Sequence, residues 1–230
     1  MWAIKRAANR AGYDIKYYHP YYDALLKNYG IKTVIDIGAN DGQFATDLHR
    51  RAPEAKIYSF EPLQDAFRSL CKNMSDVKNF TAFNFALGDA SGKTEINRSS
   101  FSPSSSLLSM SSLHKKLYPK SAGSVKEQIT VKRLDDMNNE IKIVGGLLIK
   151  MDVQGYEGKV IDGGKQMLKK AEVVIAETSF VSLYENQPLF ADIHDLMKSL
   201  GFSYRGNTEK HWNNATGEPM YENSVFIKEK

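Results

Sequence analysis

The feature that most constrains this chain is a regular alternation of short apolar runs and amphipathic segments that begins at Ile31. The apolar runs are rich in β-branched and aromatic residues, which is typical of buried strands. Between them, apolar residues recur at helical spacing, as in Phe67, Leu70 and Met74. The first predicted strands are 33–37, 56–60 and 79–85, and the first predicted helices are 43–52 and 67–74. This alternation predicts an α/β fold built on a parallel, doubly wound sheet.

The alternation is interrupted between residues 88 and 135 and then resumes. Within the interruption, 92–98 and 128–134 look extended, and a Ser-rich stretch at 99–106 disfavours helix. We expect a loop or flap at 99–112, since long loops in compact domains are commonly lids. Beyond it the predicted elements are strands at 146–152 and 172–177, helices at 157–170 and 190–200, and closing strands at 201–204 and 224–227.

Composition narrows the class of protein. The 230 residues, 42% of them hydrophobic, suffice for one domain at 31–230 without disulfide or metal cross-links. Cys71 is the only cysteine, which excludes a disulfide within the chain and a multi-Cys zinc site. No run approaches the roughly 20 apolar residues of a membrane span. Charges at Lys5, Arg6 and Arg10 interrupt the N-terminus, so we expect no secretory signal and a cytoplasmic location.

The basic residues are scattered rather than clustered. A net charge of +4 therefore does not indicate a dedicated nucleic-acid groove, and no nucleic-acid partner is expected. Residues 1–30 form a predicted N-terminal helical extension, and its residues 1–18 are basic and loosely amphipathic. Such a helix can lie on an anionic membrane, but docking on the surface of the domain is the favoured alternative.

The segment Asp36-Ile-Gly-Ala-Asn-Asp-Gly42 joins the end of a predicted strand to the start of a helix. Glycines let the backbone approach a ligand closely there, and the helix start offers free N–H groups. The spacing is G-x-x-x-G, which matches neither the dinucleotide-binding nor the phosphate-binding glycine pattern, and this disfavours NAD and ATP. A tight turn without a ligand is the alternative.

Two further strand ends should meet the same sheet edge. Glu61 follows the second predicted strand, where an acidic side chain can accept hydrogen bonds from both hydroxyls of an adenosyl ribose. A solvated surface Glu is the alternative. The third predicted strand ends in Asn84-Phe-Ala-Leu-Gly-Asp89, which would place polar groups and backbone amides beside an adenine.

The segment Lys150-Met-Asp-Val-Gln-Gly-Tyr-Glu157 ends an otherwise apolar strand with two carboxylates. Asp152 and Glu157 can orient a substrate, take a proton or bind a metal ion. The sequence is therefore compatible with a divalent metal but does not indicate one. The alternative is structural, with Asp152 capping the next helix and Glu157 in its first turn. Among the histidines, 114, 194 and 211 are weaker candidates for a base.

Taken in order, these blocks resemble the FkbM family of S-adenosylmethionine-dependent methyltransferases. Leu134-Asp135, Glu177 and Gly201-Phe202 also fit, and the resemblance runs from about residue 31 to 204. Gln154 stands where the family more often has Glu. The resemblance implies a Rossmann-like class I methyltransferase, with a seven-stranded, mostly parallel sheet, helices on both faces and an antiparallel last strand. It also implies methyl transfer to a hydroxyl of a sugar, a polysaccharide precursor or a natural product, with S-adenosyl-L-methionine as cofactor.

The resemblance places the cofactor by position, while the catalytic and acceptor residues are predicted from the strand end at Asp152 and from the Ser-rich segment. Cofactor binding is expected at Asp36, Gly38, Asn40, Asp41, Gly42, Glu61, Pro62, Asn84, Ala86, Leu87 and Asp152. Catalysis is expected at Asp152 first and Glu157 second, and acceptor binding at Ser104, Ser105, Ser106 and Glu177.

Three competing functions stay open at this stage. A nucleic-acid methyltransferase would need an Asn/Asp-Pro-Pro-aromatic segment where this chain has Asp152-Val-Gln-Gly. An NAD-dependent oxidoreductase is disfavoured by the glycine spacing. A non-catalytic scaffold that binds S-adenosylmethionine is disfavoured by the intact acidic residues at 36, 61, 152 and 157.

Overall fold

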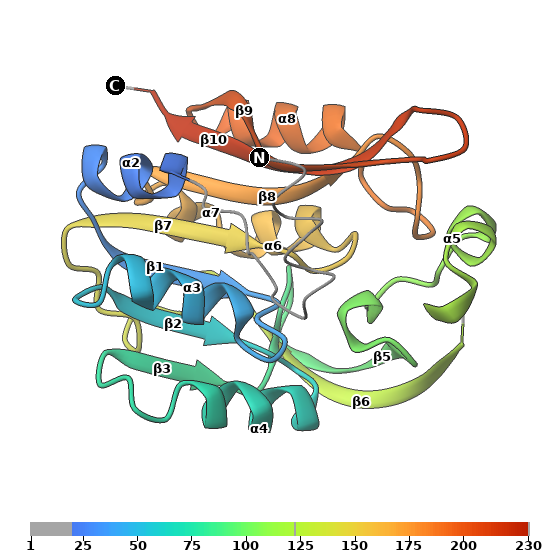
Figure 1. Ribbon diagram of the computed structural model, residues 1–230. Coiled ribbons are helices and arrows are strands. Elements are labelled where there is room, and N and C mark those ends of the chain that lie inside the picture. Colours follow the sequence, from blue (N-terminus) through green and yellow to red (C-terminus); the bar gives the residue numbers. More distant parts are fainter. Residues whose placement is uncertain (1–19, 122, 230) are drawn as a thin grey trace, which may run out of the picture.

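A central sheet of seven strands organises the computed structural model, which describes residues 20–121 and 123–229 (Figure 1). The strand order is β3-β2-β1-β7-β8-β10-β9. Its strands are β1 (Ile31–Ile37), β2 (Lys56–Phe60), β3 (Phe80–Phe83), β7 (Gly146–Met151), β8 (Val173–Ser179), β9 (Phe202–Trp212) and β10 (Pro219–Lys228). β10 runs antiparallel to both of its neighbours, and the other pairs are parallel. The predicted sheet, including its antiparallel last strand, is confirmed.

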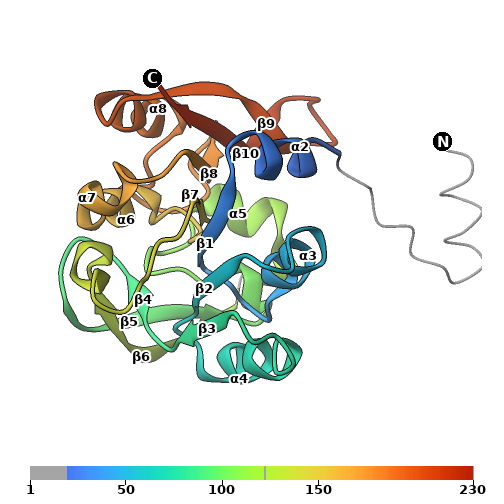
Figure 2. The same cartoon turned by 90° about the vertical axis from the view of Figure 1, so that its left-hand side faces the viewer.

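Helices cover both faces of this sheet (Figure 2). One face carries α2 (Pro20–Asn28), α3 (Gln43–Arg51) and α4 (Gln64–Asn73), and the other carries α6 (Glu157–Gly163), α7 (Lys165–Leu168) and α8 (Phe190–Ser199). β1 shows why two layers are needed: Val34 packs in the core with α2–α4, and Ile35 packs in the core with α6–α8. A parallel strand buried on both faces requires the nearly continuous apolar run seen in the sequence.

A second, three-stranded sheet lies beside the carboxyl ends of the central strands, with the order β4-β6-β5. Its strands are β4 (Ala86–Leu87), β5 (Gly92–Ser99) and β6 (Ser124–Lys132). The predicted strand at 79–85 is wrong at its end, because β3 stops at Phe83. The side chain of Asn84 turns the chain there by donating hydrogen bonds to the carbonyls of Glu61 and Pro62, at 2.9 and 3.0 Å.

The Ser-rich segment at 99–106 begins the connection from β5 to β6, which lies beyond the carboxyl ends of the parallel strands (Figure 1). This connection contains the short helices η1 (Ser102–Ser104), α5 (Ser112–Leu117) and η2 (Pro119–Ser121). Two serine hydroxyls hold the Ser-rich segment in place: Ser99 Oγ donates to the Ser121 carbonyl, and Ser106 Oγ donates to the Gln154 carbonyl at 2.6 Å. The segment therefore contacts the body of the domain, and its role as a flap stays a prediction.

The predicted helix at 157–170 is interrupted, which corrects the expectation from the sequence. It consists of α6 and α7, separated at Gly163–Gly164. A Cβ at Gly163 would lie 1.8 Å from the Gly88 carbonyl oxygen. The chain after β4 therefore packs directly against the end of α6, where no side chain fits. A 3₁₀ turn, η3 (Leu134–Met137), packs against the same region.

Helix α2 docks on the domain rather than standing apart from it. Leu26 is buried in the core with α3 and α4, and the Tyr21 hydroxyl donates a hydrogen bond to the Thr208 carbonyl. The docking alternative is thus supported for the described residues of the N-terminal extension. The membrane contact considered for 1–18 lies outside the described residues. Within 20–121 and 123–229, no helix is long and apolar enough to span a membrane.

The turn after β1 depends on the absence of a side chain at Gly38. Its φ is +80°, and a Cβ built there would lie 1.9 Å from the Asp152 carbonyl oxygen. The amide of Asp152 in turn donates to the Ile37 carbonyl. β1 and β7 therefore approach each other so closely at their ends that only glycine fits.

We predict that Gly38→Ala lowers the free energy of unfolding by about 2–4 kcal/mol, because it adds left-handed strain and a backbone clash. Urea denaturation measures the change. Gly92→Ala is the matched control, since no heavy atom lies within 4 Å of a Cβ built there. Equal stability of the two variants would contradict this account of the turn.

Candidate active site

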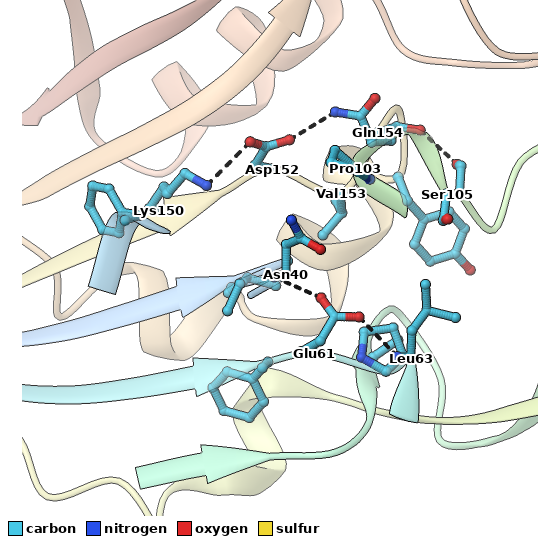
Figure 3. A pocket seen from close by; sticks show the side chains of 18 of the residues that line it. Asn40, Glu61, Leu63, Pro103, Ser105, Lys150, Asp152, Val153 and Gln154 are labelled. Atoms are coloured by element: carbon cyan, nitrogen blue, oxygen red, sulfur yellow. Dashed lines mark hydrogen bonds and ion pairs between the residues drawn. The ribbon is translucent and has the colours of Figure 1, made fainter. Parts of the chain in front are cut away.

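A cavity of about 320 Å³ opens at the carboxyl ends of β1, β2 and β7 (Figure 3). Parallel α/β sheets bind ligands at this edge. One end of the cavity is apolar and includes Leu63, which packs with Ile96, while the other end presents Lys150 and Asp152 (Figure 3). We call this the first cavity. It suits a ligand with one apolar and one ionic end.

The Glu61 carboxylate lies on the wall between these two ends. It accepts hydrogen bonds from the backbone amides of Asn40, at 2.8 Å, and Leu63, at 2.9 Å. The residue is only 5% exposed, and burial raises the pKa of its carboxyl to about 7, although the two amides oppose the shift. Two backbone donors thus fix this carboxylate in one orientation, and its remaining lone pairs are available to a ligand.

A cluster of three charged side chains joins β1 to β7. Lys150 Nζ lies 3.2 Å from Asp152 Oδ2 and 3.8 Å from Asp36 Oδ1. Asp36 is fully buried, and burial raises its pKa to about 6. Burial lowers the pKa of Lys150, but the two carboxylates outweigh this effect and the net shift is upward. The ammonium also lies 5.3 Å from the centre of the Phe44 ring. Lys150 therefore remains charged inside the protein.

The predicted cofactor residues fall into two groups. Those that line the first cavity are Gly38, Asn40, Glu61, Pro62, Ala86, Leu87 and Asp152. The others do not line the cavity but contact the residues around it. Asp36 pairs with Lys150, and Asn84 donates a hydrogen bond to the Glu61 carbonyl. The turn at Asp41 and Gly42 packs on α4. Ser105 and Ser106, predicted to bind the acceptor, line the first cavity as well.

Several lining residues were missed from the sequence. Lys150 could have been found, because a lysine inside an otherwise apolar strand is unusual for a fully buried sheet. Tyr22 of α2 and Asn223 of β10 also reach the first cavity, from positions far away in the sequence. No local pattern identifies them, since their role depends on how distant elements pack.

The two predicted catalytic carboxylates have different surroundings. Each oxygen of Asp152 has one partner: Lys150 lies 3.2 Å from one, and the Gln154 side-chain amide donates to the other at 2.9 Å. Glu157 is 2% exposed and accepts a hydrogen bond from the Val153 amide at 2.9 Å, in the first turn of α6. Burial raises its pKa to about 7. This geometry supports the structural alternative for Glu157, as a group that stabilises the start of its helix.

A second cavity of about 690 Å³ lies on the other side of the Ser-rich segment. Ser104 and Glu177, both predicted to bind the acceptor, line this second cavity. Gln154 lines both cavities. His114 is in the wall, where its Nε2 lies 3.0 Å from Ser121 Oγ. The two cavities thus adjoin at Gln154, two residues after Asp152.

Residues 20–121 and 123–229 contain no group of three or more His, Cys, Asp or Glu side chains arranged to hold a metal ion. His194 and His211 lie outside both cavities, paired with Asp195 and stacked on Tyr221 respectively. Acidic and polar side chains line both cavities.

The sheet topology and the ligand-sized cavity at its carboxyl edge give the architecture, and the match to a family model gives the class: a seven-stranded S-adenosylmethionine-dependent methyltransferase. The model of the methyltransferase FkbM domain matches residues 36–204. The chain belongs to that family.

Two relatives in sequence agree with this assignment. 2-O-methyltransferase NoeI of Sinorhizobium fredii (strain NBRC 101917 / NGR234) is 31% identical over 174 residues, which cover 72% of this chain and 71% of that protein. Methyltransferase sdnD of Sordaria araneosa is 27% identical over 194 residues, 74% of this chain and 73% of its own. Among solved structures, magnesium protoporphyrin IX methyltransferase (ChlM) from Synechocystis PCC 6803 with bound SAM is similar at a TM-score of 0.49 and 12% identity, over 91% of this chain and 77% of that one.

We predict that Lys150→Met lowers the free energy of unfolding by about 3–5 kcal/mol, because Asp36 would be left buried without its counter-charge. Urea denaturation at about pH 8, where Asp36 is ionised, measures the change. Lys93→Met, on the exposed side of β5, is the control. Adding Asp36→Asn to Lys150→Met should restore part of the loss. A cost below about 1 kcal/mol, the size of a surface ion pair, would show that the cluster is unimportant.

Proposed function

We propose that the first cavity binds S-adenosylmethionine and that the enzyme transfers its methyl group to a hydroxyl of a small acceptor. The observation that carries the proposal is the position of Glu61 between an apolar and an ionic end of one cavity. S-adenosylmethionine has the same order of groups: an apolar adenine, a ribose diol and a zwitterionic methionine.

In this arrangement the adenine packs against Leu63, Leu87 and Ile96. The ribose hydroxyls donate to the Glu61 carboxylate, whose orientation is already fixed by two amides. The methionine end extends past Asn40 towards Lys150 and Asp152, where both signs of charge are present. Asp36, Asp41, Gly42 and Asn84 hold the lining residues in place.

Methyl transfer is an in-line displacement, so most of the catalysis comes from holding the acceptor oxygen opposite the sulfur. The oxygen forms a bond to the methyl carbon as the carbon–sulfur bond breaks. The products are the methyl ether, S-adenosylhomocysteine with a neutral sulfur, and a proton. A base near the hydroxyl contributes roughly 10²–10⁴-fold in reactions of this kind.

A saccharide or hydroxylated natural product is the proposed acceptor class. The activity in the name of NoeI, 2-O-methyl transfer, supports an oxygen acceptor, and two fungal methyltransferases are also similar in sequence. Lys120 is the only Lys or Arg among the described residues that line the second cavity, which does not favour a nucleic-acid backbone. The flap role of 99–112 and the cytoplasmic location stay predictions.

We predict that Glu61→Ala weakens binding of S-adenosylmethionine by about 1.5–3 kcal/mol, the range for hydrogen bonds to a charged group. Isothermal titration calorimetry measures the change. Glu54→Ala is the control, since Glu54 is exposed and lies outside both cavities. Wild-type affinity in the Glu61→Ala variant would disprove the ribose assignment.

A further inference from the structure

The two cavities are separated by one stretch of the Ser-rich segment. Pro103 and Ser105 line the first cavity, and Phe101 and Ser104 line the second. Gln154, whose backbone has a φ of +53°, is common to both. The two cavities therefore approach each other at this residue.

Gln154 links two carboxylates from neighbouring strands. Its Nε2 donates one proton to Asp152 Oδ1, at 2.9 Å, and the other to Glu177 Oε1, at 3.1 Å. Its Oε1 accepts a hydrogen bond from the Tyr184 hydroxyl, at 2.9 Å. The two donated hydrogen bonds need an amide, since a Glu at this position has no N–H and would place a third carboxylate between two others. The chain Asp152–Gln154–Glu177 thus fixes the Glu177 side chain.

Glu177 is the acidic group of the second cavity. It is 9% exposed, and among the described residues Gln154 is its one hydrogen-bond partner. Around it the cavity is lined by aromatic rings and hydroxyls, including Phe101, Tyr118 and Ser104. Phe101 is 58% exposed and Tyr118 is 37% exposed, so both rings are accessible to a ligand. This combination fits a ring with one apolar face and a rim of hydroxyls.

We propose that the second cavity holds the acceptor, a saccharide-like polyol, and that Glu177 takes the proton from the hydroxyl that is methylated. The inference rests on the proposed methyl transfer. As the hydroxyl oxygen attacks the methyl carbon, the O–H electron pair stays on oxygen and the proton moves to the free carboxylate oxygen of Glu177. The sulfur keeps the electron pair of the broken C–S bond, and Glu177 later releases the proton to water.

The other candidate bases are less well placed for an acceptor in the second cavity. Asp152 lines only the first cavity, and its oxygens pair with Lys150 and Gln154. Glu157 faces the Val153 amide. The Ser121 hydroxyl donates to the Tyr118 carbonyl, so His114 donates to Ser121 from Nε2, and its Nδ1 is buried without a partner among the described residues. Glu177 is left as the base that an acceptor in the second cavity can reach.

The surroundings of Glu177 also predict its pH behaviour. Burial raises its pKa well above the ordinary value, with the charges of Asp152, Glu157 and Glu209 adding to the rise and that of Lys150 opposing it. Tyr118, Tyr184 and Tyr221 face it from the second cavity and its wall. A protonated Glu177 cannot accept the hydroxyl proton, so turnover should fall as the pH drops below the pKa of this group.

The test uses the full chain with labelled S-adenosylmethionine and methyl glycosides of hexoses, 6-deoxyhexoses and N-acetylhexosamines as acceptors. Glu177→Gln keeps an oxygen that accepts from Gln154 but cannot take a proton. We expect kcat to fall on the order of 10²-fold or more and the acidic limb of the kcat/KM profile to disappear, with affinity for S-adenosylmethionine and thermal stability unchanged. Glu185→Gln, exposed on the same connection after β8, is the control.

A second variant tests the place of the acceptor independently of the base. Phe101→Ala changes an exposed ring and should raise KM for the glycoside with little change in kcat. Full turnover with an intact acidic limb in Glu177→Gln, or an unchanged KM in Phe101→Ala, overturns this inference while leaving methyl transfer in place. A wild-type protein that binds the cofactor but methylates no glycoside overturns the proposed acceptor class, and this inference with it.

Discussion

The ion pairs of Lys150 with Asp36 and Asp152 join the carboxyl ends of β1 and β7, the two central strands. The first cavity lies at this edge of the sheet. A fully buried carboxylate such as Asp36 requires a counter-charge, because burial strongly disfavours its charged form. The same join brings the backbone of Gly38 against Asp152, where no side chain fits. The turn after β1 and the segment after β7 are therefore fixed together, and both cavities depend on them.

The chemistry follows from this edge in two steps. Strands β1, β2 and β7 end around the first cavity. Its apolar end, the Glu61 carboxylate and its ionic end are proposed to contact successive parts of one ligand. Strand β8 then adds Glu177, which reaches the second cavity and is tied to Asp152 through Gln154. Adjacent parallel strands thus place the proposed cofactor and acceptor sites side by side. The Ser-rich segment separates them and contributes residues to both.

The parallel strands of the central sheet could be predicted from the sequence, because buried parallel strands need apolar runs and these runs are visible at 33–37 and 146–152. The sequence also located the turn at Gly38 and the carboxylate of Glu61, whose positions depend only on local strand ends. It did not show that α6 and α7 separate, and the close contact of Gly163 with Gly88 could not be predicted because Gly88 lies in another element. The second cavity was not predicted either, because residues far apart in the sequence come together to line it.

A crystal structure with S-adenosylhomocysteine tests the central claim most directly. The account predicts that both ribose hydroxyls lie within hydrogen-bonding distance of the Glu61 carboxylate, that the adenine contacts Leu63 and Leu87, and that the sulfur faces Gln154 at the junction of the two cavities. A nucleoside bound in the second cavity, or a ribose that does not contact Glu61, would contradict it.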